Sequence, residues 1–332
     1  MFSPEEYQLL DFGEGRRLER FGELILDRPC PSASTLRRSD RDLWRRADAV
    51  FYETPRRNSD AARVALGTRG VWRAQTPLGA RFFIDASENE NANGAESGEC
   101  RPWKIRYSEK FVLELKGSPF GHVGAFPEQA ENWDRIAELC RAAEREQNEP
   151  TRLLNLFGYT GGSALASASA GAETTHLDAA RNVVDRAKRN ATLSFSESTC
   201  GAIRWIVDDA SKYVKRSVKR GARFNGIVLD PPSYGHGARG ETWRLSRDLP
   251  RLLSDCVELL DERFAFVVLT CHTPKFEASK LAQLLKDALR ARFYFDDYST
   301  EFLAKKLELR SLSGRALPSG DLALATLRRK RF

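Results

Sequence analysis

The sequence RLLNLFGYTGG at residues 152–162 joins an apolar, strand-like run to a glycine-rich turn. A segment of small residues, Ser163 to Ala170, follows and is compatible with a helix that ends before Gly171. In a strand, glycine turn and helix of this kind, the backbone at the start of the helix can approach a nucleotide closely. The glycine spacing is not GxGxxG, which weakens the alternative of a dinucleotide-dependent oxidoreductase.

Two further apolar runs end in aspartates. Residues 174–177 lead to Asp178, twenty residues beyond Gly158, where a carboxylate grips ribose hydroxyls in nucleotide sites. Residues 203–207 lead to Asp208 and Asp209, where a carboxylate could accept a hydrogen bond from an adenine amino group. A lone aspartate after a strand more often caps a helix. The prediction of a nucleotide site therefore depends on the glycine turn and the two aspartates occurring in this order at successive strand ends.

A fourth run, residues 226–229, is followed by DPPSY at residues 230–234. The run is typical of a buried parallel strand, so Asp230 is expected at the carboxyl end, where open α/β sheets bind ligands. The two prolines fix φ and lack N–H groups, so the turn presents its carbonyls and the ring of Tyr234 in a set orientation. A planar base could be held there by hydrogen bonds and stacking; the alternative is a proline-rich turn without chemistry.

The domain organisation follows from the pattern of segments along the 332 residues. Alternating strands and helices up to residue 289, and a last strand at 321–327, predict an α/β parallel sheet with helices on both faces. Ahead of it, β-like segments at 16–26 and 71–85 predict a small mixed or β-rich domain. Residues 103–115 alternate like a hairpin, and the polar residues 87–98 predict a mobile loop. We therefore expect an N-terminal domain of residues 1–108 and a catalytic domain of residues 109–332.

In this order, the segments 154–161, Asp178, Asp209 and 230–234 resemble the motifs of class I S-adenosylmethionine-dependent methyltransferases. The branch they resemble most is that of ribosomal RNA large-subunit methyltransferase I. The resemblance covers about residues 109 to 332, and Gly121 to Gln129 is similar to the family's lead-in to its first motif. It implies a Rossmann-like seven-stranded sheet with an antiparallel last strand, S-adenosylmethionine as cofactor, and a base in ribosomal or other structured RNA as substrate.

The resemblance also implies roles for single residues. The methionine end of the cofactor would contact Gln129 and the turn at 157–161. The ribose would contact Asp178, and the adenine would contact Asp209. Asp230 would lie at the methyl-transfer region. The expected cofactor-binding residues are Gln129, Asn155, Phe157, Gly158, Tyr159, Thr160, Gly161, Asp178, Asp209 and Asp230. The expected catalytic residues are Asp230, Pro231, Pro232, Tyr234 and Cys271.

Cys271 follows a fifth strand-like run and is expected at the same sheet edge as Asp230. Methylation of C5 of cytosine or uracil needs a thiolate that first adds at C6, because the pyrimidine carbon is a poor nucleophile. His272 could lower the thiol pKa, although adjacent residues of an extended chain point in opposite directions. The alternative is that Cys271 packs as a small hydrophobe and that an amino group of a base or of protein glutamine is methylated without a nucleophile.

Charge favours a polyanionic partner, since the chain carries a net charge of +7 and a pI near 9.1. All twelve cations between residues 25 and 84 are arginines, against six acids, and aromatic residues are interleaved with them as a nucleic-acid surface would need. These arginines are Arg28, Arg37, Arg38, Arg41, Arg45, Arg46, Arg56, Arg57, Arg63, Arg69, Arg73 and Arg81; the aromatic residues are Trp44, Phe51, Tyr52 and Trp72. The alternative is a solvated face in an arginine-rich chain. A second basic cluster at 212–223 has helical spacing and is expected to be a solvated helix face.

Several classes of protein are disfavoured by the sequence. No apolar stretch reaches 18 residues and the N-terminus lacks the pattern of a secretory signal, so a cytoplasmic protein is expected. The six cysteines form no C-x-x-C pair, so neither a metal site nor a disulfide framework is expected. An RNA methyltransferase that flips its base into the pocket beside Asp230 is the favoured function, and an oligomer is possible. The alternative is a non-catalytic RNA-binding or assembly protein that keeps the fold.

Overall fold

The computed structural model describes residues 1–54, 69–83, 100–236 and 242–330. The chain divides into two compact units: unit 1 is Met1–Glu128 with Glu308–Ser319, and unit 2 is Gln129–Leu307 with Gly320–Phe332. The expected boundary between residues 108 and 109 falls inside unit 1. The loop expected at residues 87–98 lies outside the described residues.

The hairpin at residues 103–115 belongs to unit 1 because its contacts are made there. Trp103 donates a hydrogen bond from Nε1 to the carbonyl oxygen of Phe21 at 3.2 Å. The segment beyond the hairpin is held in the same way, since Arg28 donates to the carbonyl oxygen of Gly121 at 3.1 Å. Both contacts join this segment to strands of the N-terminal sheet.

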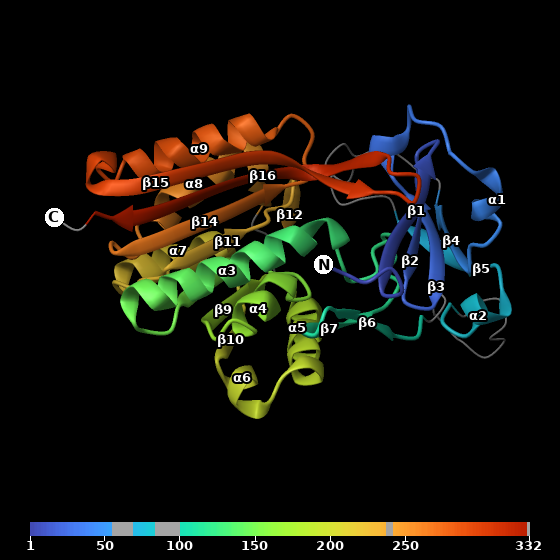
Figure 1. Cartoon of the computed structure of the whole chain (residues 1–332), viewed down its shortest axis with the longest axis horizontal. Coiled ribbons are helices and arrows are strands. Elements are labelled where there is room, and N and C mark those ends of the chain that lie inside the picture. Colours follow the sequence, from blue (N-terminus) through green and yellow to red (C-terminus); the bar gives the residue numbers. More distant parts are fainter. Residues whose placement is uncertain (55–68, 84–99, 237–241, 331–332) are drawn as a thin grey trace. The chain divides into compact units, whose positions relative to one another are not determined.

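Unit 2 is built on a seven-stranded sheet (Figure 1). Its strands, in spatial order, are β10 (Ile203–Val207), β9 (Glu173–Asp178), β8 (Arg152–Leu156), β11 (Gly226–Leu229), β14 (Phe264–Cys271), β16 (Ala316–Arg329) and β15 (Tyr298–Arg310). The first five pair in parallel, and β16 runs antiparallel to β14. The predicted Rossmann-like seven-stranded sheet with an antiparallel last strand is confirmed.

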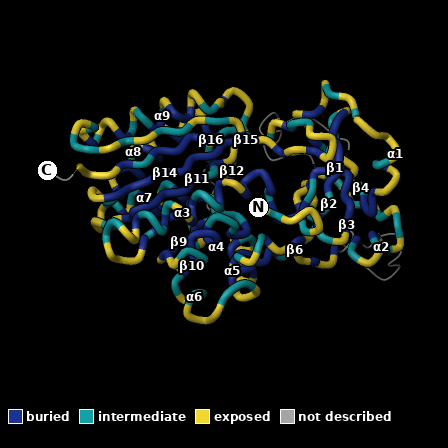
Figure 2. The backbone as a smooth tube through the Cα atoms, in the orientation of Figure 1, coloured by how far each residue is buried: buried dark blue, intermediate teal, exposed yellow. Residues whose placement is uncertain are grey.

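Helices cover both faces of this sheet. They are α3 (Ala130–Gln147), α4 (Gly162–Ala168), α5 (Arg181–Ser194), α6 (Glu197–Gly201), α7 (Ala210–Lys219), α8 (Leu245–Val257) and α9 (Ala278–Arg290). Alternate residues of β14 enter different cores: Val267 and Leu269 pack with α7, α8 and α9, whereas Phe266 and Val268 pack with α3. The buried central strands appear dark in Figure 2. None of the described helices is long and apolar enough to cross a membrane.

Unit 1 contains a five-stranded sheet in the order β1-β2-β3-β4-β5. The strands are β1 (Tyr7–Gly13), β2 (Arg16–Phe21), β3 (Leu24–Pro29), β4 (Ala49–Glu53) and β5 (Gly70–Ala74). Its neighbours pair antiparallel except β3 and β4, which are parallel. The hairpin of β6 (Trp103–Tyr107) and β7 (Phe111–Leu115) and the short helix α1 (Arg41–Trp44) complete it. The predicted small β-rich N-terminal domain is therefore present.

The expectation of a β-like segment over residues 71–85 holds only at its start. After β5 the chain forms the short helix α2 (Pro77–Ala80), because Thr76 accepts a hydrogen bond from Gly79 N and Pro77 suits the first turn. Phe83 then makes a single bridge to Cys100 rather than a strand. Ile84 lies outside the described residues.

Candidate functional site

The glycine turn after β8 has a backbone that few side chains tolerate. Phe157 and Tyr159 have φ values of 56° and 49°, and Gly161 has φ 96°. A Cβ atom at Gly158 would lie 2.4 Å from Cε1 of His176, so this position requires glycine. The turn is further held by a hydrogen bond from Gly158 N to the carbonyl oxygen of Leu177 at 2.9 Å.

Asp178, at the end of β9, accepts hydrogen bonds from the backbone of this turn and of the segment that follows β9. Its Oδ2 accepts from Tyr159 N and its Oδ1 from Ala180 N, both at 3.0 Å. Burial raises the pKa of Asp178, and the backbone N–H groups only partly offset this effect. Each carboxylate oxygen can accept a second hydrogen bond, and the side chain is partly exposed. A ribose with adjacent hydroxyls fits this donor and acceptor set beside a bare glycine backbone.

Asn155, in β8 just before the same turn, and Thr160, within the turn, contact neighbouring residues of the protein. Nδ2 of Asn155 is 3.4 Å from Nδ1 of His176, and the carbonyl oxygen of Thr160 accepts from Asn190 at 2.9 Å. Burial lowers the pKa of His176 to about 4, so this ring is neutral and serves as packing for the turn. Neither His176 nor Asn190 was expected as part of the site. For His176 the sequence did offer a signal, because it is a polar residue within the buried strand β9.

Asp209 caps a helix, which was one of the two interpretations of its position. It is the N-cap of α7 and accepts a hydrogen bond from Lys212 N at 2.9 Å. The neighbouring Asp208 pairs with Arg216. An adenine contact would use the remaining lone pairs of Asp209, and this role stays a prediction.

The turn at residues 230–234 is held to the glycine turn by Trp243. The indole Nε1 of Trp243 donates to the carbonyl oxygen of Pro232 at 2.7 Å, and its ring lies 5.1 Å from that of Phe157. Tyr234 begins the short strand β12 (Tyr234–His236), which pairs with β13 (Thr242–Arg244). One of the proline carbonyls that could hold a base is thus already bound within the protein.

Gln129 and Asp230, distant in sequence, meet at the carboxyl ends of β11 and β14. Nε2 of Gln129 lies 3.2 Å from Oδ2 of Asp230 and 3.2 Å from Oγ1 of Thr270. Burial alone would raise the pKa of Asp230, but His272, Thr270 and Gln129 together lower it below its usual value. Asp230 is therefore ionised at neutral pH. The structure brings together the two residues expected at the methionine end and at the methyl-transfer region.

Cys271 points away from this group. Its side chain is 0 % exposed and packs in the core cluster that also contains Leu269 and Phe276. Burial raises the pKa of the Cys271 thiol, and the N–H of Thr273, 3.4 Å from Sγ, only partly offsets this. Thr270 and Cys271 thus face opposite sides of β14, as neighbours on a strand do.

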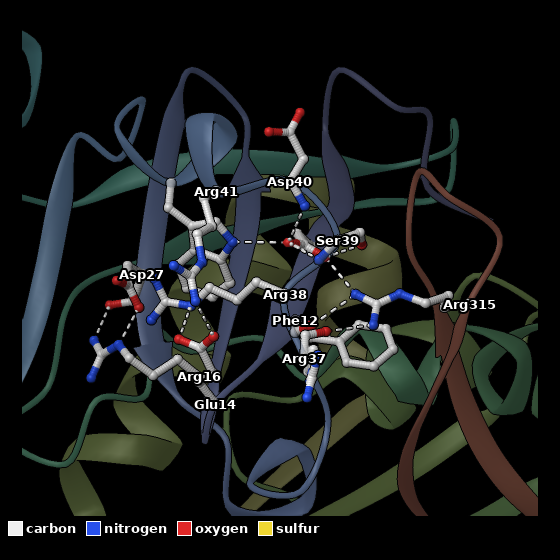
Figure 3. Close-up of polar contacts among 12 residues, drawn as sticks. Phe12, Glu14, Arg16, Asp27, Arg37, Arg38, Ser39, Asp40, Arg41 and Arg315 are labelled. Atoms are coloured by element: carbon white, nitrogen blue, oxygen red, sulfur yellow. Dashed lines mark hydrogen bonds and ion pairs between the residues drawn. The ribbon is translucent and has the colours of Figure 1, made fainter.

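The arginines of unit 1 fall into two sets. Arg28 is buried and pairs with Glu19 at 2.5 Å, and Arg38 lies 3.9 Å above the ring of Trp44 and pairs with Glu14. Figure 3 shows how several of these side chains turn toward carboxylates of the same unit. The exposed arginines are Arg37, Arg41, Arg45, Arg46, Arg69, Arg73 and Arg81. Of these, Arg41 pairs with Glu14 at 3.4 Å and Arg45 with Asp42 at 3.2 Å. Arg56, Arg57 and Arg63 lie outside the described residues.

Two of the four aromatic residues expected between the arginines lie in the core. Trp44 and Phe51 are buried, and Trp44 donates from Nε1 to Oδ2 of Asp11 at 2.9 Å. Tyr52, with 44 % of its surface exposed, is the member of this group that a base could reach, and Arg73 lies over its ring at 5.3 Å. Composition could not distinguish a buried aromatic residue from one exposed for stacking on a base, because each of these side chains packs equally well in a sheet core.

Comparison with known proteins identifies the fold of unit 2. Residues 133–276 match the sequence model of a family described as S-adenosylmethionine-dependent methyltransferase. Those residues are an S-adenosylmethionine-dependent methyltransferase domain. The expected enzyme class and cofactor agree with this family, whose motif positions 154–161 and 230–234 lie within the matched range.

Relatives of the methyltransferase domain carry related names. The ribosomal RNA large subunit methyltransferase I of Cronobacter sakazakii is 30 % identical over 150 residues, which is 44 % of this chain and 35 % of that protein. That of an Escherichia coli strain is 25 % identical over 184 residues, covering 55 % of this chain and 44 % of that protein. The chain thus spans less than half the length of these curated relatives.

A solved structure resembles the whole chain. The SAM-dependent methyltransferase from Agrobacterium tumefaciens is 29 % identical, with a TM-score of 0.75 over 98 % of this chain and 91 % of that chain. The likeness therefore includes unit 1 as well as the methyltransferase domain.

Among the described residues, no group of three or more His, Cys, Asp or Glu side chains could hold a metal ion.

Proposed function

We propose that this protein transfers a methyl group from S-adenosylmethionine to a base in ribosomal or other structured RNA, in the cytoplasm. The observation that carries the proposal is the hydrogen bond between Gln129 and Asp230 next to the turn at residues 157–161. It places a partly exposed carboxylate at the end of a parallel strand, beside the glycine turn, where such sheets bind their ligands. The names of the curated relatives support RNA as the substrate.

The residues of the site suit this cofactor. Asp178 offers free lone pairs for ribose hydroxyls, Gly158 lets the backbone come close, and the negative charge of Asp230 favours a cation. When bound, the cofactor supplies a sulfonium-activated methyl group. The protein holds the base opposite that group, at the turn where Tyr234 can stack on it.

For the methylated atom, we propose C5 of cytosine, with Cys271 adding to C6. In the free protein Cys271 is buried and its pKa is raised, so this chemistry requires RNA binding to expose the thiol. A ring or exocyclic nitrogen, which needs no nucleophile, is the alternative that this burial favours. The two can be separated by experiment.

We propose that exposed arginines of unit 1 contact the RNA. Arg37, Arg45 and Arg46 lie close in sequence around α1, and the exposed Tyr52 offers a ring for stacking. The buried Arg28 and the stacked Arg38 instead stabilise the domain.

The test is incubation of the protein with labelled S-adenosylmethionine and with rRNA from cells that lack this protein. Mass spectrometry of the labelled nucleotide then identifies the base and the atom. Transfer of label to RNA is expected. A parallel reaction contains protein extract, which offers protein as an alternative methyl acceptor. Binding of S-adenosylmethionine without transfer of label to any RNA would contradict RNA methylation.

A further inference from the structure

His272 joins the pair formed by Gln129 and Asp230. Its Nε2 lies 3.3 Å from Nε2 of Gln129 and 3.5 Å from Oδ1 of Asp230. The side chains of His272 and Asp230 are 35 % and 31 % exposed, so a base entering the site can reach the imidazole. His272 was considered from sequence only as a neighbour of Cys271.

The orientation of the Gln129 amide is fixed by a neighbour on α3. Nδ2 of Asn132 donates to Oε1 of Gln129 at 2.7 Å, so the amide nitrogen faces Asp230. That nitrogen carries two protons, whereas Asp230, Thr270 and His272 present three acceptor positions within 3.3 Å. The amide nitrogen of Gln129 can donate to the imidazole Nε2 when that nitrogen carries no proton.

The same geometry accommodates a proton on His272. Oδ1 of Asp230 is buried and has no hydrogen-bond partner among the described residues, and it is the carboxylate oxygen nearest to Nε2. A protonated Nε2 would donate toward this oxygen, and the attraction between imidazolium and carboxylate would stabilise the charged ring. The separation of 3.5 Å between Nε2 of His272 and Oδ1 of Asp230 is short enough for this attraction.

The position of the ring is set by β16. A Cβ atom on Gly320 would lie 2.8 Å from Nδ1 of His272, and Gly320 has φ +142°, so the ring packs against bare backbone. His272 follows Cys271, whose thiol lies in the core on the other face of β14, and it shares the side of Thr270. The nearby carboxylate of Asp321, also on β16, accepts from Ala278 N at 2.9 Å.

We propose that His272 is a catalytic base that accepts the proton lost by the methylated atom, with Asp230 stabilising the resulting imidazolium. The inference rests on the proposed function. The target atom, carbon or nitrogen, forms a bond to the methyl carbon, and the sulfur–methyl bond breaks with its electron pair left on sulfur. The proton of the target atom moves to Nε2 of His272 and leaves to solvent after product release.

The kinetic test compares His272→Gln and His272→Gly with the wild-type protein and with His122→Gln, an exposed histidine of unit 1. Single-turnover transfer to RNA is measured against pH, and cofactor affinity by calorimetry. We expect His272→Gln to lower the rate about 100-fold or more at neutral pH with cofactor affinity unchanged. The rise of the wild-type rate with pH should disappear in this variant, and imidazole in the buffer should restore His272→Gly but not accelerate the wild type.

A second measurement does not depend on turnover. The chain has four histidines, so the His272 ring signal in NMR can be assigned by its loss in His272→Gln. Replacing Asp230 by Asn should move the titration of the His272 ring to lower pH, because the neighbouring carboxylate that stabilises the charged ring is lost.

The outcomes separate this inference from the proposed function. Wild-type protein that binds the cofactor but methylates no RNA contradicts both. If the wild type is active and His272→Gln keeps its rate and its pH profile, only the role of His272 is wrong. An unchanged His272 titration in Asp230→Asn contradicts the stabilising role of Asp230, and restoration of His272→Gly by imidazole supports proton acceptance.

Discussion

Gly158 lies directly against the ring of His176, with space for no more than a hydrogen atom between them. We expect Gly158→Ala to displace the ring or the turn, because the added Cβ would be 2.4 Å from Cε1. Cofactor affinity should fall at least about tenfold, a loss of about 1.4 kcal/mol, as measured by calorimetry. Gly201→Ala, where nothing lies within 4 Å of the added atom, is the matched control and should bind normally.

Asp178 supplies a second prediction on cofactor binding. Asp178→Ala should weaken S-adenosylmethionine binding by about 1.5 to 3 kcal/mol, since it removes a charged acceptor for the ribose. Burial raises the pKa of Asp178, so the wild-type affinity should decrease as the pH falls toward this pKa, at a higher pH than for an exposed aspartate. An affinity independent of pH between pH 4 and neutrality, or normal binding by Asp178→Ala, would contradict the ribose contact.

The salt dependence of RNA binding tests the arginines of unit 1. Replacing Arg37, Arg45 and Arg46 by Ala should weaken binding and flatten the plot of log affinity against log salt by about 0.7 for each lost contact on single-stranded RNA. The control removes as many charges from α7 and its C-cap, with Lys212, Lys219 and Arg220 changed to Ala. Equal slopes for both triple variants would show that the arginines of unit 1 form only a solvated face.

The strands of the methyltransferase domain could be predicted because buried parallel strands have continuous apolar sequences. Residues 203–207 and 226–229 were assigned with the bounds of β10 and β11. The edge strand β15 was missed because charged residues alternate along it, and its place depends on pairing with β16.

The site could be predicted only in part. The motifs indicated the ends of the strands, and Gln129 and Asp230 do meet there. The direction of each side chain depends on which face of its strand it occupies. Sequence alone therefore placed Cys271 at the same edge as Asp230 without showing that its thiol lies in the core while His272 faces the carboxylate.

The reactivity of Cys271 tests the choice between carbon and nitrogen methylation. In the free protein, iodoacetamide should label the partly exposed Cys200 well before Cys271, because Cys271 is buried and its pKa is raised. If the target is C5 of cytosine, RNA binding must expose the thiol, Cys271→Ala must lose turnover while still binding the cofactor, and RNA with 5-fluorocytosine must trap a covalent complex. The fluorine replaces the proton that has to leave C5, so the complex should survive denaturing electrophoresis. Activity retained in Cys271→Ala, with no trapped complex, would instead identify a nitrogen held at the Asp230 turn, because that reaction needs no covalent step.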